Sequence, residues 1–412
     1  MKISLRSGEI SPTRREERDI PAMKSDVARR LESLSGASGS EIFALGDEIE
    51  RRLSSGEFEW VDLFAEAVAL RAASGTGEGL HYQVVLDRVR RTLAAHPGPQ
   101  SLRILTAVVA SRGADAQERV RAERGLARLV ADGHRVEDIA GVVFAAGAAS
   151  TLSREFKACL LHELVFLSIP VEEYPALRAF AGTLVSEGHP LAVLPLRLLP
   201  SERGLRRPRS AADDWTWAMP PASVSAFDEP ELLASPDALR RTSGIDMTEI
   251  TDAPSAAAMG VAVRPWCSES NGVVAAQDFW SPDAVSPDDF AAVLRRLPLT
   301  AWPEGQPPVR VAPTTPDTVL RTLLTAAVLR SAYGSGLGRA YGRLAAWQSL
   351  GGLTGAPADA PPARVTELVE QTHWFRIAPV SDWFNEVAWD LAVAALRPGG
   401  QEIAVLTATD TD

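Results

Sequence analysis

The chain has 412 residues, of which 46% are apolar and 23% are charged, and its formal net charge at pH 7 is −11. This composition is that of a globular protein with material for about two or three domains, and it excludes a chain too polar to form a core. The acidic balance argues against a nucleic-acid-binding protein, because such binding requires Lys and Arg to neutralise phosphates. The densest basic run, 203–210, is predicted to be a solvated linker.

The cysteine content and the apolar runs indicate a compartment. Cys159 and Cys267 are too few and too distant for a disulfide framework or a metal cluster, which favours a reducing environment. The N-terminus lacks the apolar core of a signal peptide, and no stretch approaches the roughly 20 apolar residues that span a bilayer. Arg greatly outnumbers Lys, as is typical of high-GC bacterial genomes. We expect a soluble, cytoplasmic bacterial protein that binds neither membrane nor nucleic acid.

The N-terminal half has a helical pattern. Residues 1–22 are polar and are predicted to form a disordered tail. From 23 to 199 apolar residues recur at helical spacing, glycines such as Gly56 and Gly75 close the periods, and strand signals are scarce. Short helices joined by tight turns predict an all-α domain of helical hairpins that is solenoid-like.

Histidines in this half could carry chemistry. The words LVADGH and LVSEGH place His134 and His189 just after a glycine that ends a helix. We interpret both as helix-stop signals, since neither has a carboxylate or cysteine at ligand spacing; a metal or catalytic pair is the alternative. HELVF at 162–166 resembles the beginning of a zinc-protease helix, but Phe166 stands where the second histidine must be. No metal site and no cofactor is predicted.

The C-terminal half changes character twice. Residues 200–258 are rich in Pro, Ser and Asp and are predicted to be a linker or irregular connection with one short helix near 229–241. From 259 to 412 strand and helix signals alternate, which predicts a mixed α+β domain, so that the whole chain is of the α+β class. In chain order we predict a hairpin over 260–280, helices beginning at Ser286 and Thr315, strands at 308–313 and 373–380, a helix at 382–397 and a strand at 401–412.

The segment SAYGSGLGRAYGRLAAW, 331–347, raises the question of a phosphate-binding loop. The dinucleotide fingerprint fails because Arg339 stands where the third glycine must be, and no Lys supplies a Walker motif. Glycines instead recur every four residues from Gly334 to Gly342, which places them on one face of a helix and indicates close packing. A helix break near 336, with Arg339 and Arg343 holding an anion at the new helix N-terminus, is the alternative.

A column of carboxylates has the same spacing. Asp382, Glu386 and Asp390 recur every four residues on the predicted 382–397 helix, as do Arg339 and Arg343 on the glycine helix. We predict that the two helices pack with these arginines paired to Glu386 and Asp390. A ligand-binding pocket is the alternative, and the candidate ligand-binding residues are Arg339, Arg343, Glu386, Asp390 and His373. No catalytic residue is predicted.

Three segments of the C-terminal part resemble hypothetical proteins of high-GC bacteria that form a family of unknown function. These segments are AYGRLAAWQSLGGL, WFNEVAWDLAVAALRPGG and LTATDTD. The resemblance implies no activity and no site residues. We predict a non-catalytic protein-interaction or scaffold protein whose helical domain presents a surface to a partner protein. The alternative is an enzyme or small anionic-ligand-binding protein with a site between segments 334–347 and 382–397.

Overall fold

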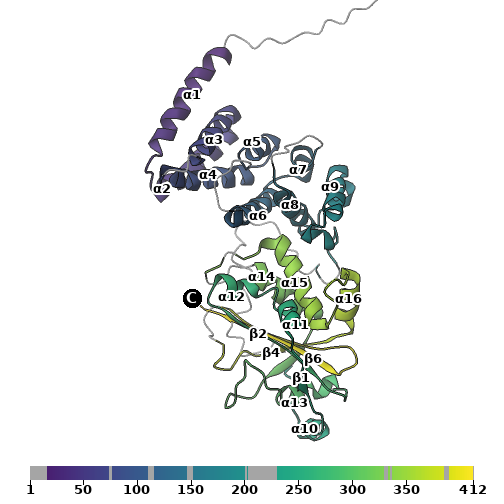
Figure 1. Cartoon of the computed structure of the whole chain (residues 1–412). Coiled ribbons are helices and arrows are strands. Elements are labelled where there is room, and N and C mark those ends of the chain that lie inside the picture. Colours follow the sequence, from purple (N-terminus) through teal and green to yellow (C-terminus); the bar gives the residue numbers. More distant parts are fainter. Residues whose placement is uncertain are drawn as a thin grey trace, which may run out of the picture. The chain divides into compact units, whose positions relative to one another are not determined.

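The computed structural model describes residues 16–73, 77–109, 116–145, 152–199, 202, 230–328, 333–334, 336–384 and 389–411. It divides into two compact units, Met1–Lys157 and Ala158–Asp412, called here the first and second unit. The described residues form sixteen α-helices and one six-stranded sheet, and the sheet belongs wholly to the second unit (Figure 1). The predicted α+β class with a helical N-terminal part is therefore confirmed.

The first unit consists of helices. They are α1 (Glu16–Ser33), α2 (Gly39–Ser54), α3 (Phe58–Ala72), α4 (Gly77–Ala95), α5 (Pro99–Val109), α6 (Ala116–Gly133) and α7 (Val136–Val142), and α8 (Arg154–Phe166) crosses the division between the units. Helix α2 shows how the sequence specifies them: Ser38 and Glu41 form a capping box at its beginning, and its apolar stripe from Ile42 to Leu53 is buried. Helix α1 begins at Glu16, inside the segment predicted to be a tail.

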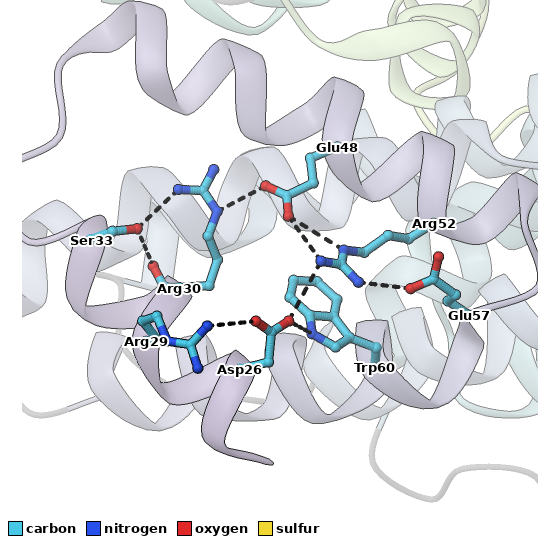
Figure 2. A network of polar contacts seen from close by, with 8 residues as sticks. All are labelled: Asp26, Arg29, Arg30, Ser33, Glu48, Arg52, Glu57 and Trp60. Carbon is cyan, nitrogen blue, oxygen red and sulfur yellow. Dashed lines mark hydrogen bonds and ion pairs between the residues drawn. The ribbon is translucent and has the colours of Figure 1, made fainter. Parts of the chain in front are cut away.

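A polar network joins α1 to α2 and α3 (Figure 2). Arg52 of α2 forms ion pairs with Glu48 at 3.3 Å, with Glu57 at 2.7 Å and with Asp26 of α1 at 3.6 Å. The indole N–H of Trp60 donates to the same Asp26 at 2.9 Å, and the Arg52 guanidinium carbon lies 3.7 Å from the centre of the Trp60 ring. Because the charged side chains stay partly exposed while Trp60 is buried, the network ties α1 to its neighbours without burying a charge.

The second unit is built around an antiparallel sheet. Its strands lie in the order β1 (Thr248–Glu249), β2 (Val273–Trp280), β6 (Glu402–Asp410), β5 (Trp389–Leu396), β4 (His373–Ile377) and β3 (Val311–Thr314). Its helices are the end of α8, η1 (Val171–Glu173), α9 (Pro175–Ser186), η2 (Pro190–Val193), α10 (Pro236–Thr242), α11 (Ala253–Met259), α12 (Arg264–Glu269), η5 (Pro287–Asp289), α13 (Phe290–Leu294), α14 (Pro316–Val328), α15 (Gly338–Thr354) and α16 (Pro362–Gln371).

Helices cover both faces of this sheet (Figure 1). Alternate residues of β5, Ala392, Ala394 and Leu396, belong to a core that also contains Phe290 and Val293 of α13. Helices α11, α12, α14 and α15 pack on the sheet as well, and Figure 1 shows them on the side opposite α13. A strand in such a position is apolar on both faces.

Two predicted elements are wrong for reasons of burial and backbone geometry. The segment 389–396 is strand β5 and not part of a helix. The prediction failed because a continuous apolar run that is buried on both faces lacks the alternation that distinguishes a strand from a buried helix. The first strand of the predicted 260–280 hairpin is helix α12, with Pro265 in its first turn, where a missing N–H costs nothing. The predicted strands corresponding to β3, β4 and β6 and the helix α14 are confirmed.

Candidate functional site

The glycine segment forms the beginning of helix α15. Gly336 and Gly338 have φ values of 71° and 72°, in the left-handed region that favours glycine, and α15 then runs from Gly338 to Thr354. A Cβ added at Gly342 would lie 2.4 Å from Cγ2 of Val328 at the end of α14, so the absence of a side chain lets these two helices approach closely. From Gly338 onward the segment is therefore a packing helix, as the spacing of Gly338 and Gly342 predicts, while Gly334 lies before the helix and the break is that of the alternative interpretation.

The helix face beside the glycines carries two arginines, and the first pairs with Glu163 of α8. The Arg339 Nε donates to one carboxylate oxygen at 2.5 Å, and the backbone N–H of Ala340 donates to the other at 3.2 Å. The Arg339 and Glu163 side chains are 10% and 2% exposed, and the Phe166 ring lies 5.5 Å from the guanidinium. Glu163 thus neutralises the arginine and also caps the first turn of α15, where the helix dipole favours a negative charge.

Arg343, one turn further along α15, is more deeply buried. Its Nε and Nη2 donate to the two carboxylate oxygens of Glu202 at 2.6 and 2.8 Å, the bidentate geometry that makes such pairs strong. The remaining contacts go to the carbonyl oxygens of Pro195 at 3.0 Å and Arg197 at 3.1 Å. A guanidinium has five N–H groups and no acceptor, and the two carbonyls use donors that the carboxylate leaves over.

Glu202 is equally well satisfied. Besides both bonds from Arg343, it accepts the indole N–H of Trp347 at 2.6 Å and the backbone N–H of Leu199 at 2.6 Å. The Arg343 and Glu202 side chains are 2% and 0% exposed. A buried charge is tolerated only when it is paired and hydrogen-bonded in this way. The arrangement fixes α15 to Glu202 and to the backbone of Pro195 and Arg197, and it leaves little capacity on Arg343 to receive an anion.

His162 lies next to Glu163 in α8 and is 1% exposed. Burial lowers the pKa of its imidazole to about 3, and the charges of Arg343 and His189 lower it further, while the backbone of Leu191 opposes the change weakly. Neither ring nitrogen reaches a partner in hydrogen-bond geometry among the described residues. The imidazole is therefore neutral at physiological pH.

Two of the other candidate residues, Asp390 and His373, lie on strands and not on a helix. Asp390 is on strand β5 and accepts a hydrogen bond from Thr409 of β6 at 2.6 Å. His373 is exposed at the beginning of β4, and Glu386 lies outside the described residues. The predicted packing of Arg339 and Arg343 against a helix over 382–397 is wrong, because no helix forms over the described part of that segment and the arginines pair with Glu163 and Glu202.

The two LV-x-x-GH motifs lie at the ends of helices and form local contacts there. His189 begins η2, and its Nδ1 accepts the N–H of Leu191 at 3.3 Å, after Gly188 with φ of 65°. His134 follows α6 and is buried, with its Nε2 at 3.3 Å from the Leu93 carbonyl, and burial lowers its pKa. No group of three His, Cys, Asp or Glu residues within the described ranges could hold a metal ion. None of the helices described there is long and apolar enough to cross a membrane.

Sequence reasoning identified the arginines and missed their partners. Glu163 had a weak signal, because it and His162 are the only polar residues in the otherwise apolar run ACLLHELVF. Glu202 had none, since it stands beside the basic run 203–210 and is 141 positions from Arg343.

Comparison with known proteins gives one match. A family model described as a family of unknown function (DUF6183) matches residues 43–412. The match extends far beyond the three C-terminal segments that show the resemblance, and it includes α3–α16 and the whole sheet. No curated protein and no solved structure matches the chain.

Proposed function

Because the chain belongs to this family of unknown function, we propose its role from its own geometry: it is a non-catalytic protein of the bacterial cytoplasm that binds a partner protein through its first unit. The observation that carries the proposal is an exposed surface on α2 and α4, formed by the apolar residues Phe43 and Val84 and the charged residues Asp47 and Arg88 and called here the Phe43 surface. The chain has only two cysteines, Cys159 and Cys267, too few for a disulfide framework, which supports a reducing compartment.

The Phe43 surface combines exposure with a rigid support. Phe43 is 67% exposed and Val84 is 55% exposed. The Arg88 guanidinium carbon lies 5.1 Å from the centre of the Phe43 ring, and its Nη2 donates to the Phe43 carbonyl at 3.3 Å. A Cβ at Gly46 would lie 2.2 Å from the Arg88 Nε, so the arginine rests directly on the backbone of α2.

The charges on this surface indicate what it binds. The ion pair between Arg88 and Asp47 spans 3.9 Å, and Asp47 is 79% exposed, so the guanidinium is only weakly neutralised. Aromatic residues and arginine are enriched in protein interfaces, and an exposed apolar patch beside a charge is typical of a binding site. The partner that fits is a protein segment with an apolar side chain to cover Phe43 and a neighbouring carboxylate to pair with Arg88.

The alternative function, a small anionic ligand bound between segments 334–347 and 382–397, receives less support. It needs guanidinium groups that are accessible and not yet neutralised. Arg339 and Arg343 are instead buried against glutamates at 2.5 and 2.6 Å. Displacing either glutamate would leave a buried charge without a partner, which is strongly unfavourable.

Quantitative affinity capture from the native cells tests the proposal. The full chain is compared with the variant Phe43→Ser/Val84→Ser and with a matched control, Leu233→Ser/Ile250→Ser, which changes two exposed apolar residues of the second unit. We expect one or more proteins to be retained by the wild type and by the control and lost from the first variant. Equal retention by all three proteins would show that the Phe43 surface is not the interface, and no specific retention by the wild type would contradict the interaction role.

A further inference from the structure

One edge of the six-stranded sheet stays open. Strand β2 pairs with β6 without a bulge from Val273 to Trp280, whereas β1 pairs with β2 only at Phe279 and Trp280. Within the described part of the chain, residues 273–277 therefore form an open edge of the sheet, called here the β2 edge. It belongs to the second unit and shares no residue with the Phe43 surface of the first unit.

The backbone of Asp278 shows which groups of β2 point outward at this edge. Its carbonyl oxygen accepts the N–H of Ile250 at 2.8 Å, and its N–H donates to Oγ1 of Thr251 at 2.9 Å, so both groups face away from β6. Because residues two apart on a strand present their backbone groups to the same side, the N–H and C=O groups of Val274 and Ala276 also face outward. These four groups form no backbone hydrogen bond with any described residue.

The opposite edge of the sheet is closed. The N–H of Leu232 donates to the carbonyl oxygen of Val311 in β3 at 2.8 Å, and Pro313 of the same strand has no N–H to donate. The β2 edge lacks such protection, because its sequence VVAAQ contains no proline and no charged residue, and Val273 is 49% exposed. Native proteins usually protect a sheet edge against pairing, so this one indicates a site where a strand can be added.

Two carboxylates stand at one end of the β2 edge. Glu249 accepts a hydrogen bond from the side chain of Gln277 at 3.3 Å, and Asp252 accepts the N–H of Ser255 at 2.7 Å as the cap of α11. Both carboxylates are exposed, and neither forms an ion pair with a described residue. The charge that complements them is a Lys or Arg on the added strand. A second copy of this chain fits poorly, because two chains with a net charge of −11 repel each other.

We propose that the β2 edge binds an extended segment of a partner protein, which adds a strand along residues 273–277 and places a Lys or Arg next to Glu249 and Asp252. The backbone of this segment forms hydrogen bonds with the outward groups of Val274 and Ala276, and these main-chain bonds supply affinity. Selectivity comes from the cation and from β-branched side chains, which suit a pleated surface. The added strand continues the line of β1.

A synthetic peptide tests the proposal on the full chain. Acetyl-Lys-Val-Thr-Val-Lys-amide has β-branched residues between two lysines, so that either strand direction brings a cation to the carboxylates. We expect saturable binding with a dissociation constant below about 1 mM, measured by calorimetry. Hydrogen exchange of the segment 272–280 should slow when the peptide is bound, and that of β3 should not change. The same peptide with every amide N-methylated cannot donate to the edge and should bind at least about tenfold more weakly.

Two sets of variants locate the contacts. Val274→Pro removes an outward N–H and leaves the bonds to β6, because an edge strand tolerates proline where its N–H would face solvent. It should weaken peptide binding about tenfold, whereas Val274→Thr keeps both the N–H and the side-chain shape and should bind as the wild type does. Glu249→Gln/Asp252→Asn retains the cap of α11 and should weaken binding about threefold at low salt.

The proposal would be overturned by any of three outcomes: no saturable binding of the peptide, equal binding of its N-methylated form, or equal binding by Val274→Pro and Val274→Thr. Self-association of the chain that the peptide displaces would identify a second copy as the occupant and would also overturn it. Should Val274→Pro fail to fold, the N-methylated peptide still decides whether main-chain bonds hold the segment. Phe43→Ser/Val84→Ser should bind the peptide as the wild type does, so failure here is distinct from failure of the Phe43 surface.

Discussion

Arg30 and Glu48 in the first unit and Arg343 and Glu202 in the second pair at similar distances, 2.8 and 2.6 Å, in very different surroundings. The first pair has side chains that are 28% and 18% exposed, and the second has side chains that are 2% and 0% exposed. Water and salt screen the first pair and can solvate either member if the other is lost. Water and salt cannot solvate a single member of the second pair, so Arg343 and Glu202 are stable in the interior only together.

The largest expected effect comes from removing one member of the buried pair. Glu202→Ala leaves Arg343 buried and uncompensated and should lower the free energy of unfolding by about 3–5 kcal/mol. Urea unfolding followed by tryptophan fluorescence measures it, because nine of the ten tryptophans belong to the second unit.

The controls for this prediction lie in the same unit. Glu231→Ala removes a partner of Arg310 from a pair whose side chains are 25% and 37% exposed, and it should cost about 1 kcal/mol or less. The double variant Arg343→Met/Glu202→Leu should be more stable than Glu202→Ala, because no buried charge remains. Equal losses for Glu202→Ala and Glu231→Ala would show that burial does not distinguish the two kinds of pair.

A second prediction separates close packing of α15 from its ion pairs. Gly342→Ala places a methyl group 2.4 Å from Val328 and should destabilise the fold by about 1–3 kcal/mol. Gly351→Ala, in the same helix, meets its nearest atom at 3.8 Å and should be neutral or stabilising by up to about 1 kcal/mol. Thermal unfolding of both variants measures the difference, and similar melting temperatures would mean that the glycine stripe does not determine the packing.

The third prediction concerns pH. The pKa of His162 is lowered from 6.5 to about 3 in the folded state, mainly by burial and then by Arg343 and His189. Between these two pKa values the unfolded chain binds more protons than the folded chain, so the free energy of unfolding falls as the pH is lowered. The contribution of His162 to stability is therefore complete above pH 6.5 and is lost as the pH falls toward 3. One proton corresponds to a slope of about 1.4 kcal/mol per pH unit.

The variant His162→Leu isolates this contribution. Urea unfolding of the wild type and the variant at pH values between about 5 and 7 should show a weaker loss of stability on acidification for the variant. Parallel curves for the two proteins would contradict the assignment of a neutral, buried His162.

The same comparison explains which parts of the candidate site could be predicted from the sequence. The helix around Arg339 and Arg343 follows from their spacing by four and from that of the neighbouring glycines, which are local properties of the chain. Their partners Glu163 and Glu202 are 176 and 141 positions away, and a single sequence contains no record of which distant carboxylate faces which arginine. For that reason we predicted carboxylates of the segment 382–397, instead of Glu163 and Glu202, as partners of the two arginines.

The misassigned strand β5 has a different physical cause. Its residues Asp390–Leu396 are all buried, so both faces carry apolar side chains and the strand period is absent. Its alanines and leucines also favour helices, and the contacts of a central strand override that preference. In contrast, β6 is predicted correctly from residues such as Thr407 and Thr409, which favour strands.

The smallest expected effect belongs to the exposed network of the first unit (Figure 2). Arg30→Ala removes the pair with Glu48 and should cost about 1 kcal/mol or less, because exposed pairs gain little Coulomb energy in water. The cost should shrink further in high salt, where the Debye length falls to about 3 Å at 1 M. Hydrogen exchange of α1 amides at low and high salt measures it locally. A loss of stability as large as that expected for Glu202→Ala, or a loss that does not change with salt, would contradict the prediction that exposure to water weakens this ion pair.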